Sequence, residues 1–218
     1  VPLQFHNLRE NNPEQFDQLG TILLGGSPFD QDTESFIQTL DNKVYQSFGM
    51  TETVSHIALR KVGDESAYTC LPDVSVAKGD QDELMIHAPS ITGQEVLRTK
   101  DVVSLINDKQ FIWKGRLDFI INSGGIKICP EEVEVRCAQQ IAEPHIVSSI
   151  PDKVLGSVVV LCIELSDEQS LDRIQQVLDA TDFPKYHRPK KVIRIPKIPR
   201  LENGKINRLA VNEFLQES

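Results

Sequence analysis

The sequence LGTILLGG, residues 19–26, sets the fold of the first part of the chain. Its apolar centre predicts a buried strand, and its two final glycines predict a turn at the carboxyl end of that strand. Ser27-Pro28 then opens a predicted helix that continues to about Leu40, and Val44–Phe48 is the next short strand. Strand, helix and strand in this order indicate an α/β arrangement, in which ligands bind beyond the carboxyl ends of the strands.

From about Ile57 to Trp113 the pattern changes to short β-like runs that are separated by turns. These runs are Ser75–Ala77, Glu83–Ala88, Val102–Ile106 and Gln110–Lys114. They predict a β-rich piece, either a small barrel or a sheet. We therefore expect a first domain over residues 1–115, with its boundary near Gly115–Asp118.

Residues 116–218 predict a second, compact α+β domain of a common size. Its expected elements are strands Phe119–Asn122 and Ile126–Ile128, a helix from Pro130 to about Ile141, strands His145–Ile150 and Ser157–Glu164, a helix from about Ser170 to Ala180, and strand Lys191–Ile195. Pro130 followed by Glu131 and Glu132 suits the positive end of a helix dipole. The fold class expected for the whole chain is α/β plus α+β.

Composition limits the kinds of protein that this chain can be. Hydrophobic residues make up 39% and charged residues 25%, as in soluble globular proteins. No apolar run approaches the roughly 18 residues of a membrane span, and the first residues lack the features of a secretory signal. Cys70, Cys129, Cys137 and Cys162 are scattered without metal-ligand spacing, which fits the reducing cytoplasm.

The net charge of −9 argues against a nucleic-acid-binding protein. Between Pro184 and Arg208, however, nine basic residues stand against one acid, Glu202. This run is either a solvated edge of the fold or a surface for a phosphate-rich small ligand such as a nucleotide or coenzyme A. Nucleic acid is a third interpretation, but no basic surface interleaved with aromatic residues accompanies the run.

Residues 45–53, YQSFGMTET, form the first candidate site. Gly49 permits a tight turn, and Phe48 offers an aromatic face for base stacking. Thr51 offers a hydroxyl for phosphate, and Glu52 a carboxylate for Mg²⁺. Such a set within five residues indicates nucleotide binding. Taken alone, the same string also fits a plain strand and turn, with Phe48 in the core and Glu52 on the surface.

A second set of candidates lies around the predicted domain boundary. Asp101 is suited to accept hydrogen bonds from ribose hydroxyls, and Arg116 to hold ribose or phosphate. Asp118 lies where a hinge is expected. The pair Gly124-Gly125 lets the backbone approach a ligand closely. A β-hairpin with a glycine turn and a surface ion pair at Arg116 would explain the same residues without a function.

The third candidate is the tail segment IPRLENGKINR, residues 198–208. Pro199 and Asn203-Gly204 are turn residues, so Lys205 is expected on a loop. A lysine on a loop near a terminus can be delivered to an anion or withdrawn from it. Taken alone, such a lysine is more often an ordinary solvated side chain.

Together and in this order, the motifs resemble those of the adenylate-forming enzymes, which include acyl-CoA synthetases, luciferases and the adenylation domains of peptide synthetases. The matching stretches are FGMTE at 48–52, TxD at 99–101, GRxD at 115–118, NGKxxR at 203–208 and, for an adenine-side turn, LLGGSP at 23–28. Within the family, TETVSH at 51–56 and PEEVE at 130–134 are similar to the versions found in o-succinylbenzoate–CoA ligase of menaquinone biosynthesis.

The resemblance implies a reaction in two steps and a role for each candidate. A carboxylic acid, with o-succinylbenzoate favoured, attacks ATP to give acyl-AMP, and coenzyme A then displaces AMP after the second domain rotates. Lys205, Thr51 and Glu52 would be catalytic, with Glu52 also holding Mg²⁺. Ser55 and His56 would line the acid pocket. The implied residues for ATP/AMP and coenzyme A are Gly25, Gly26, Ser27, Phe48, Gly49, Met50, Asp101, Arg116, Ser123, Gly124 and Gly125, and the implied hinge is Asp118.

Some positions depart from the family pattern. Lys100 stands where glycine is usual, Phe48 where tyrosine is commoner, and Asn122 where many relatives have lysine. The chain also lacks a Gly-rich loop with a lysine of the kind that cradles the β- and γ-phosphates of ATP.

We therefore expect the chain to be the C-terminal portion of a longer ligase and to be inactive by itself. Its exposed surface predicts either a homodimer or poor solubility. The alternatives are another aryl- or acyl-CoA ligase, an amino-acid adenylation domain, or a non-catalytic module that binds a nucleotide or coenzyme A.

Overall fold

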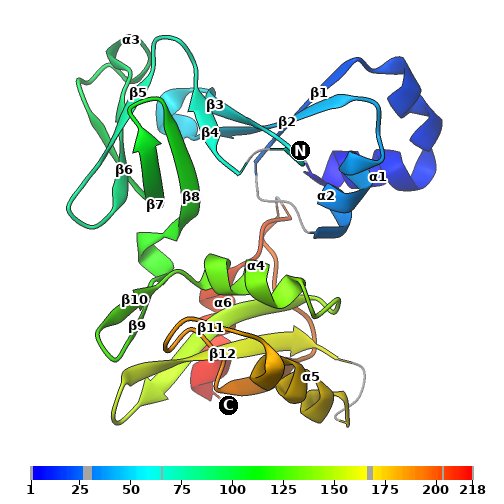
Figure 1. Ribbon diagram of the computed structural model, residues 1–218, viewed down its shortest axis with the longest axis vertical. Helices are drawn as coiled ribbons and strands as arrows, with labels where there is room; N and C mark the ends of the chain where they lie inside the picture. The colour runs from blue at the N-terminus through cyan, green and yellow to red at the C-terminus, as the bar shows by residue number, and fades with distance from the viewer. Residues whose placement is uncertain (1, 27–30, 65, 166–168, 203, 218) are drawn as a thin grey trace. The chain divides into compact units, whose positions relative to one another are not determined.

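The computed structural model describes residues 2–26, 31–64, 66–165, 169–202 and 204–217 (Figure 1). Two residues of the predicted sites, Ser27 and Asn203, lie outside these ranges. The chain divides into two compact units, Val1–Lys114 and Gly115–Ser218. Each unit has a sheet and apolar clusters of its own.

The first unit is built on an eight-stranded sheet with the order β1-β2-β3-β4-β8-β7-β6-β5. Its strands are β1 (Thr21–Gly25), β2 (Lys43–Gly49), β3 (His56–Lys61), β4 (Tyr68–Cys70), β5 (Ser75–Lys78), β6 (Glu83–His87), β7 (Leu97–Asn107) and β8 (Gln110–Arg116). Its helices are α1 (Pro2–Asn11), α2 (Gln31–Gln38) and α3 (Pro89–Thr92), with 3₁₀ turns at Pro13–Gln18 and Thr51–Thr53.

The predicted strand–helix–strand unit is confirmed. β1 and β2 pair in parallel, with Gly25 opposite Ser47, and α2 lies between them in the sequence. Parallel neighbours need such a crossover, and both strands therefore end at the same edge of the sheet. An apolar cluster covers this end of the sheet and contains Phe5, Phe16, Leu24, Ile37, Val44 and Val62.

The β-rich piece is a sheet rather than a barrel, and it continues the sheet that begins with β1 and β2. β7 starts at Leu97, five residues before the predicted start at Val102. The pairing of β6 with β7 is irregular here, because Met85 lies opposite Arg98 but Glu83 lies opposite Val102. Residues 99–101 form a bulge in β7, and their polar side chains interrupt the apolar pattern that the sequence prediction followed.

The second unit is built on a five-stranded sheet with the order β10-β9-β12-β11, in which β13 also pairs with β12. Its strands are β9 (Ile121–Ser123), β10 (Ile126–Ile128), β11 (His145–Asp152), β12 (Gly156–Glu164) and β13 (Lys191–Ile195). Its helices are α4 (Pro130–Ala138), α5 (Gln169–Ala180) and α6 (Arg208–Glu217), and a 3₁₀ turn spans Leu117–Phe119.

The central strand β12 separates two helical layers, because its successive side chains point to opposite faces. Val159, Leu161 and Ile163 pack in one cluster with residues of α4 and α5. Val160 and Cys162 pack in another with Val211 of α6. The α+β prediction for this part of the chain is confirmed, and β13 has the predicted bounds.

Two element predictions in the second unit are wrong. Residues 117–119 form a 3₁₀ turn, so the strand predicted from Phe119 begins only at Ile121. The helix predicted to reach Ile141 ends at Ala138, although Ile141 remains buried. The buried apolar side chain of Ile141 continues the spacing typical of a helix, so the sequence prediction placed the end of the helix too late. No helix in the described ranges is long and apolar enough to cross a membrane.

Candidate functional site

The loop between β2 and β3 carries the first motif, and its shape depends on Gly49. A Cβ atom at this position would lie 2.3 Å from the carbonyl oxygen of Ser55 and 2.7 Å from the Cα of His56. Real Cβ atoms do not approach backbone atoms so closely. The two strand ends can therefore converge only because residue 49 is glycine.

Thr53 closes the same loop from inside. Its hydroxyl accepts a hydrogen bond from the Met50 N–H at 3.0 Å and lies 2.8 Å from the carbonyl oxygen of Ser55. The residue is buried, whereas Thr51 and Glu52 are exposed. Val54 has a φ of 62°, an unfavourable backbone conformation for a β-branched residue. The loop is thus held in a strained shape that presents Thr51 and Glu52 to the outside.

An open hollow of about 550 Å³ lies where β1 and β2 end, which is a suitable volume for a small ligand. We call it the strand-end hollow; it is lined by Gly26, Ser47, Gly49, Met50, Thr51, Val54, Ser55 and His56. Gly26 follows β1 and the other lining residues follow or end β2, so two turns that are distant in sequence meet here. Gly25 lies opposite Ser47, and a Cβ on Gly25 would lie 2.5 Å from the Ser47 hydroxyl oxygen.

The structure brings six predicted site residues into the lining of this hollow: Gly26, Gly49, Met50, Thr51, Ser55 and His56. Ser55 Oγ lies 3.2 Å from His56 Nδ1. Phe48 is not part of the lining. Its ring is tilted against Tyr68 and Phe111, with centroids 5.6 and 5.1 Å away, so that it packs on the core.

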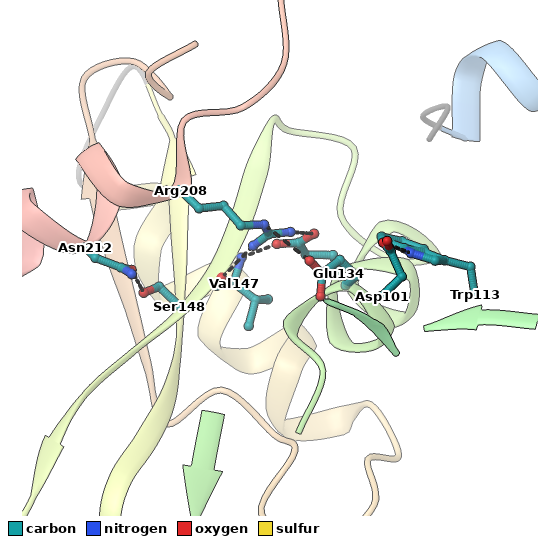
Figure 2. Close-up of polar contacts among 8 residues, drawn as sticks. Asp101, Trp113, Glu134, Val147, Ser148, Arg208 and Asn212 are labelled. Carbon is teal, nitrogen blue, oxygen red and sulfur yellow. Dashed lines mark hydrogen bonds and ion pairs between the residues drawn. The ribbon is translucent and has the colours of Figure 1, made fainter. Parts of the chain in front are cut away.

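Asp101 lies in the bulge of β7 and is 7% exposed. Its N–H donates a hydrogen bond to Thr99 Oγ1 at 3.0 Å, so the predicted Thr-x-Asp motif forms a local turn. Trp113 on β8 donates its indole N–H to Asp101 Oδ1 at 2.8 Å (Figure 2). The sequence prediction identified Asp101 but not Trp113.

In the second unit, Arg116 and Asp118 form an ion pair, with 3.2 Å between Arg116 Nη2 and Asp118 Oδ2. The turn between β9 and β10 presents Gly124 and Gly125, which have φ values of 58° and 82°. Ser123 is only 1% exposed, so its side chain points away from any ligand at this surface. The contact of Ser123 with a cofactor stays a prediction, and the neighbouring Gly124 and Gly125 are the exposed residues of this turn.

The predicted tail loop is a short hairpin. Arg200 and Ile206 form an antiparallel bridge, and the Leu201 N–H donates to the Lys205 carbonyl oxygen at 2.7 Å. Gly204 has a φ of 83°, as the turn requires. The Lys205 side chain is exposed at this turn. Lys205 thus lies on a loop, as predicted, and hydrogen bonds fix the base of that loop.

A partly buried charged cluster lies directly after the hairpin. Arg208 donates to Glu134 Oε2 at 2.6 Å and to the Val147 carbonyl oxygen at 3.2 Å (Figure 2). Arg208 Nε also lies 3.4 Å from Glu131 Oε1, and the Phe119 ring is 5.7 Å from the guanidinium carbon. The sequence prediction placed Glu131 at the positive end of a helix dipole and Arg208 in the basic run, but it did not predict that the two meet. Two acids three positions apart on one helix face were the available signal.

Whether the protein can hold Mg²⁺ depends on the ligands that its described residues offer. The described residues contain no group of three or more His, Cys, Asp or Glu side chains that could hold a metal ion. Glu52 is exposed beside the strand-end hollow, and Mg²⁺ in nucleotide sites commonly uses one or two carboxylates together with substrate phosphates. A single carboxylate fits that mode of binding. A second cavity, of about 100 Å³ beside Arg208, is too small for a nucleotide.

The chain is similar to known acid–CoA ligases over most of its length. It is 31% identical over 216 residues to 2-succinylbenzoate–CoA ligase of Listeria monocytogenes, covering 88% of this chain and 45% of that protein. The chain therefore spans about half the length of the curated relatives that it matches. No family model matches the sequence.

Solved structures give the same result for the fold. An acyl-CoA synthetase (AMP-forming)/AMP-acid ligase II-like protein from Dyadobacter fermentans is 32% identical, with a TM-score of 0.54 over 99% of this chain and 64% of that one. O-succinylbenzoate coenzyme A synthetase of Bacillus subtilis, solved with ATP and magnesium ion, has a TM-score of 0.74 at 24% identity, covering 88% and 46% of the two chains. The motifs, the fold and these matches agree: the chain belongs to the adenylate-forming enzymes, and it is similar to the C-terminal part of their 2-succinylbenzoate–CoA ligases.

Proposed function

We propose that this chain is the C-terminal part of an ATP-dependent acid–CoA ligase that acts on o-succinylbenzoate. The observation that carries the proposal is the strand-end hollow, in which the turn after β1 meets the loop Gly49–His56. Six of its lining residues are those that the family motifs assign to the nucleotide and the acid. The names of the relatives support the choice of substrate.

In the proposed first step, a carboxylate attacks the α-phosphate of ATP, its oxygen forms a bond to that phosphorus, and pyrophosphate leaves. Two anions approach each other, so a cation between them stabilises charge that develops in the transition state. Lys205 is assigned this role because its side chain is exposed on a hairpin with a fixed base. Thr51 and Glu52 would stand beside the phosphates, and Glu52 would hold Mg²⁺, which neutralises phosphate charge when bound.

In the proposed second step, the thiol of coenzyme A attacks the acyl carbon and AMP leaves with the bonding electrons. Residues 116–218 would rotate about Asp118 between the steps. Lys205 would then leave the site, and the turn Ser123–Gly125 would approach the thioester being formed. The exposed Gly124 and Gly125 suit this close approach. The division of the chain into two compact units supports such a rotation.

The four cysteines all lie in the described ranges, where they are buried and form no disulfide. This state supports the proposal that the protein works in the reducing cytoplasm. We further propose that the 218-residue chain is inactive by itself, because it contains no Gly-rich phosphate-binding loop. Homodimer formation by the chain stays a prediction.

The test uses the full-length protein and measures AMP formation with ATP, coenzyme A and a panel of acids. The panel contains o-succinylbenzoate, benzoate, a medium-chain fatty acid and several amino acids. We expect o-succinylbenzoate to give the highest kcat/KM. Turnover of amino acids or fatty acids alone would contradict the assigned substrate, and absence of AMP formation with every acid would favour a non-catalytic binding module.

A further inference from the structure

By the family motif, Asp101 hydrogen-bonds to the ribose of the nucleotide, but the motif itself includes no residue that orients the Asp101 carboxylate. Such a partner exists in this chain. Trp113 Nε1 lies 2.8 Å from Asp101 Oδ1, and both residues belong to the first unit (Figure 2). The contact crosses between two neighbouring strands, β7 and β8.

We propose that Trp113 is a positioning residue that fixes the Asp101 carboxylate for hydrogen bonding to the ribose hydroxyls of the nucleotide. This inference rests on the proposed function. Trp113 acts indirectly, because its indole N–H binds the Asp101 carboxylate rather than the nucleotide.

Local geometry explains why Asp101 needs such a partner. Residues 99–101 bulge out of the β6–β7 ladder, so the regular pairing of the sheet does not fix the direction of this side chain. The Thr99 hydroxyl holds the Asp101 N–H and thereby the backbone. A buried carboxylate is costly unless it is hydrogen-bonded, so a donor to the side chain itself is favourable. The indole N–H supplies that bond from a fixed direction.

Trp113 is well suited to hold this position. It is partly buried against the apolar cluster that also carries Phe48 and Met50 of the first motif. An indole anchored by packing has few accessible rotamers, and its only polar atom is the N–H donor. The cluster thus supports both the loop beside the strand-end hollow and the ring that orients Asp101.

The test measures binding of ATP, 2′-deoxy-ATP and 3′-deoxy-ATP to the full-length protein by calorimetry. The variants are Trp113→Phe, Asp101→Asn and the double variant, with Ile112→Val on the same strand as the packing control. A hydrogen bond to a charged group corresponds to about 10- to 100-fold in a binding constant. We expect Trp113→Phe to weaken ATP binding about tenfold, since the carboxylate itself remains.

Three further results are expected. Because each deoxy-nucleotide keeps only one of the two ribose hydroxyls, Trp113→Phe weakens the binding of each by a smaller factor than it weakens the binding of ATP. The double variant binds ATP no more weakly than Asp101→Asn. Ile112→Val binds all three nucleotides like the wild type. A merely structural role for Trp113 would instead weaken all three nucleotides equally and add to the effect of Asp101→Asn, and that result would overturn the inference.

The variants distinguish a failure of this inference from a failure of the proposed function. If Asp101→Asn weakens ATP binding and Trp113→Phe does not, only the inference is wrong. If Asp101→Asn leaves ATP binding unchanged, the ribose site of the proposed function is wrong, and the inference falls with it. Should Trp113→Phe fail to fold, replacement of Trp113 by 3-benzothienylalanine removes the N–H while keeping the ring shape, and it must give the same pattern.

Discussion

Replacing Glu131 by glutamine should remove a pH-dependent loss of stability from the second unit. The Glu131 side chain is 13% exposed, and its Oε2 atom has no hydrogen-bond partner in the described part of the chain. Burial is the main cause that raises the pKa of Glu131 to about 7, with the nearby Glu134 acting in the same direction and Arg208 against it. Arg208 gives limited help because it lies closer to Glu134, at 2.6 Å, than to Glu131, at 3.4 Å.

The magnitude follows from linkage between protonation and folding. Raising the pKa of Glu131 from its ordinary value of 4.5 to about 7 corresponds to about 3 kcal/mol. The folded state holds this proton more tightly than the unfolded state does. The stabilisation is therefore complete below pH 4.5, and it is lost as the pH rises through the interval from 4.5 to about 7.

The assay is urea unfolding of wild type, Glu131→Gln and Glu132→Gln at several pH values. Glu132 is the matched control because it is the next residue on the same helix and is exposed. The stability of Glu131→Gln relative to wild type should rise by about 3 kcal/mol between about pH 4 and pH 8, whereas that of the control should stay constant. A constant difference at all pH values, or a variant that is relatively weaker at pH 8, would refute this reasoning. The latter result would mean that ionised Glu131 supports Arg208.

Two further predictions concern the folded state. Glu134→Gln takes the nearest carboxylate from the Arg208 guanidinium, whose side chain is 13% exposed, and should lower the unfolding free energy by about 3 kcal/mol at pH 7. A loss below about 1 kcal/mol in urea unfolding would contradict this. Gly49→Ala places a Cβ atom 2.3 Å from the Ser55 carbonyl oxygen and should lower the thermal midpoint, whereas Gly20→Ala, whose Cβ meets nothing within 4 Å, should leave it unchanged. Equal midpoints for these two variants would be evidence against the close approach.

Local chemistry made part of the fold predictable from sequence. The apolar run before Gly25 and Gly26 is a strand that ends in a turn, and Lys191–Ile195 forms a strand with the predicted bounds. The spacing of apolar residues and the positions of turn residues carry this information, because both depend on neighbours in the chain. They fail where buried residues continue past the end of an element, as at Ile141.

Contacts between distant residues were not predictable in the same way. Arg208 and Glu134 are 74 positions apart, and Trp113 and Asp101 lie on different strands. Nothing in either local pattern shows that the side chains meet. Phe48 shows the same limit, because the local pattern does not reveal that its ring packs beside Phe111. Stacking of a base on Phe48 stays a prediction. Such pairs depend on strand order and register, which single-sequence patterns do not specify.

The most direct test of the proposed ligase is the Lys205→Ala variant of the full-length protein, measured in both half-reactions separately. Pyrophosphate release from ATP and o-succinylbenzoate should fall by a factor on the order of 10² to 10³, as when one transition-state contact is removed. Thioester formation from supplied acyl-AMP and coenzyme A should stay near the wild-type rate. Equal loss in both half-reactions, or no loss in the first, would contradict a lysine that serves adenylation and then leaves the site.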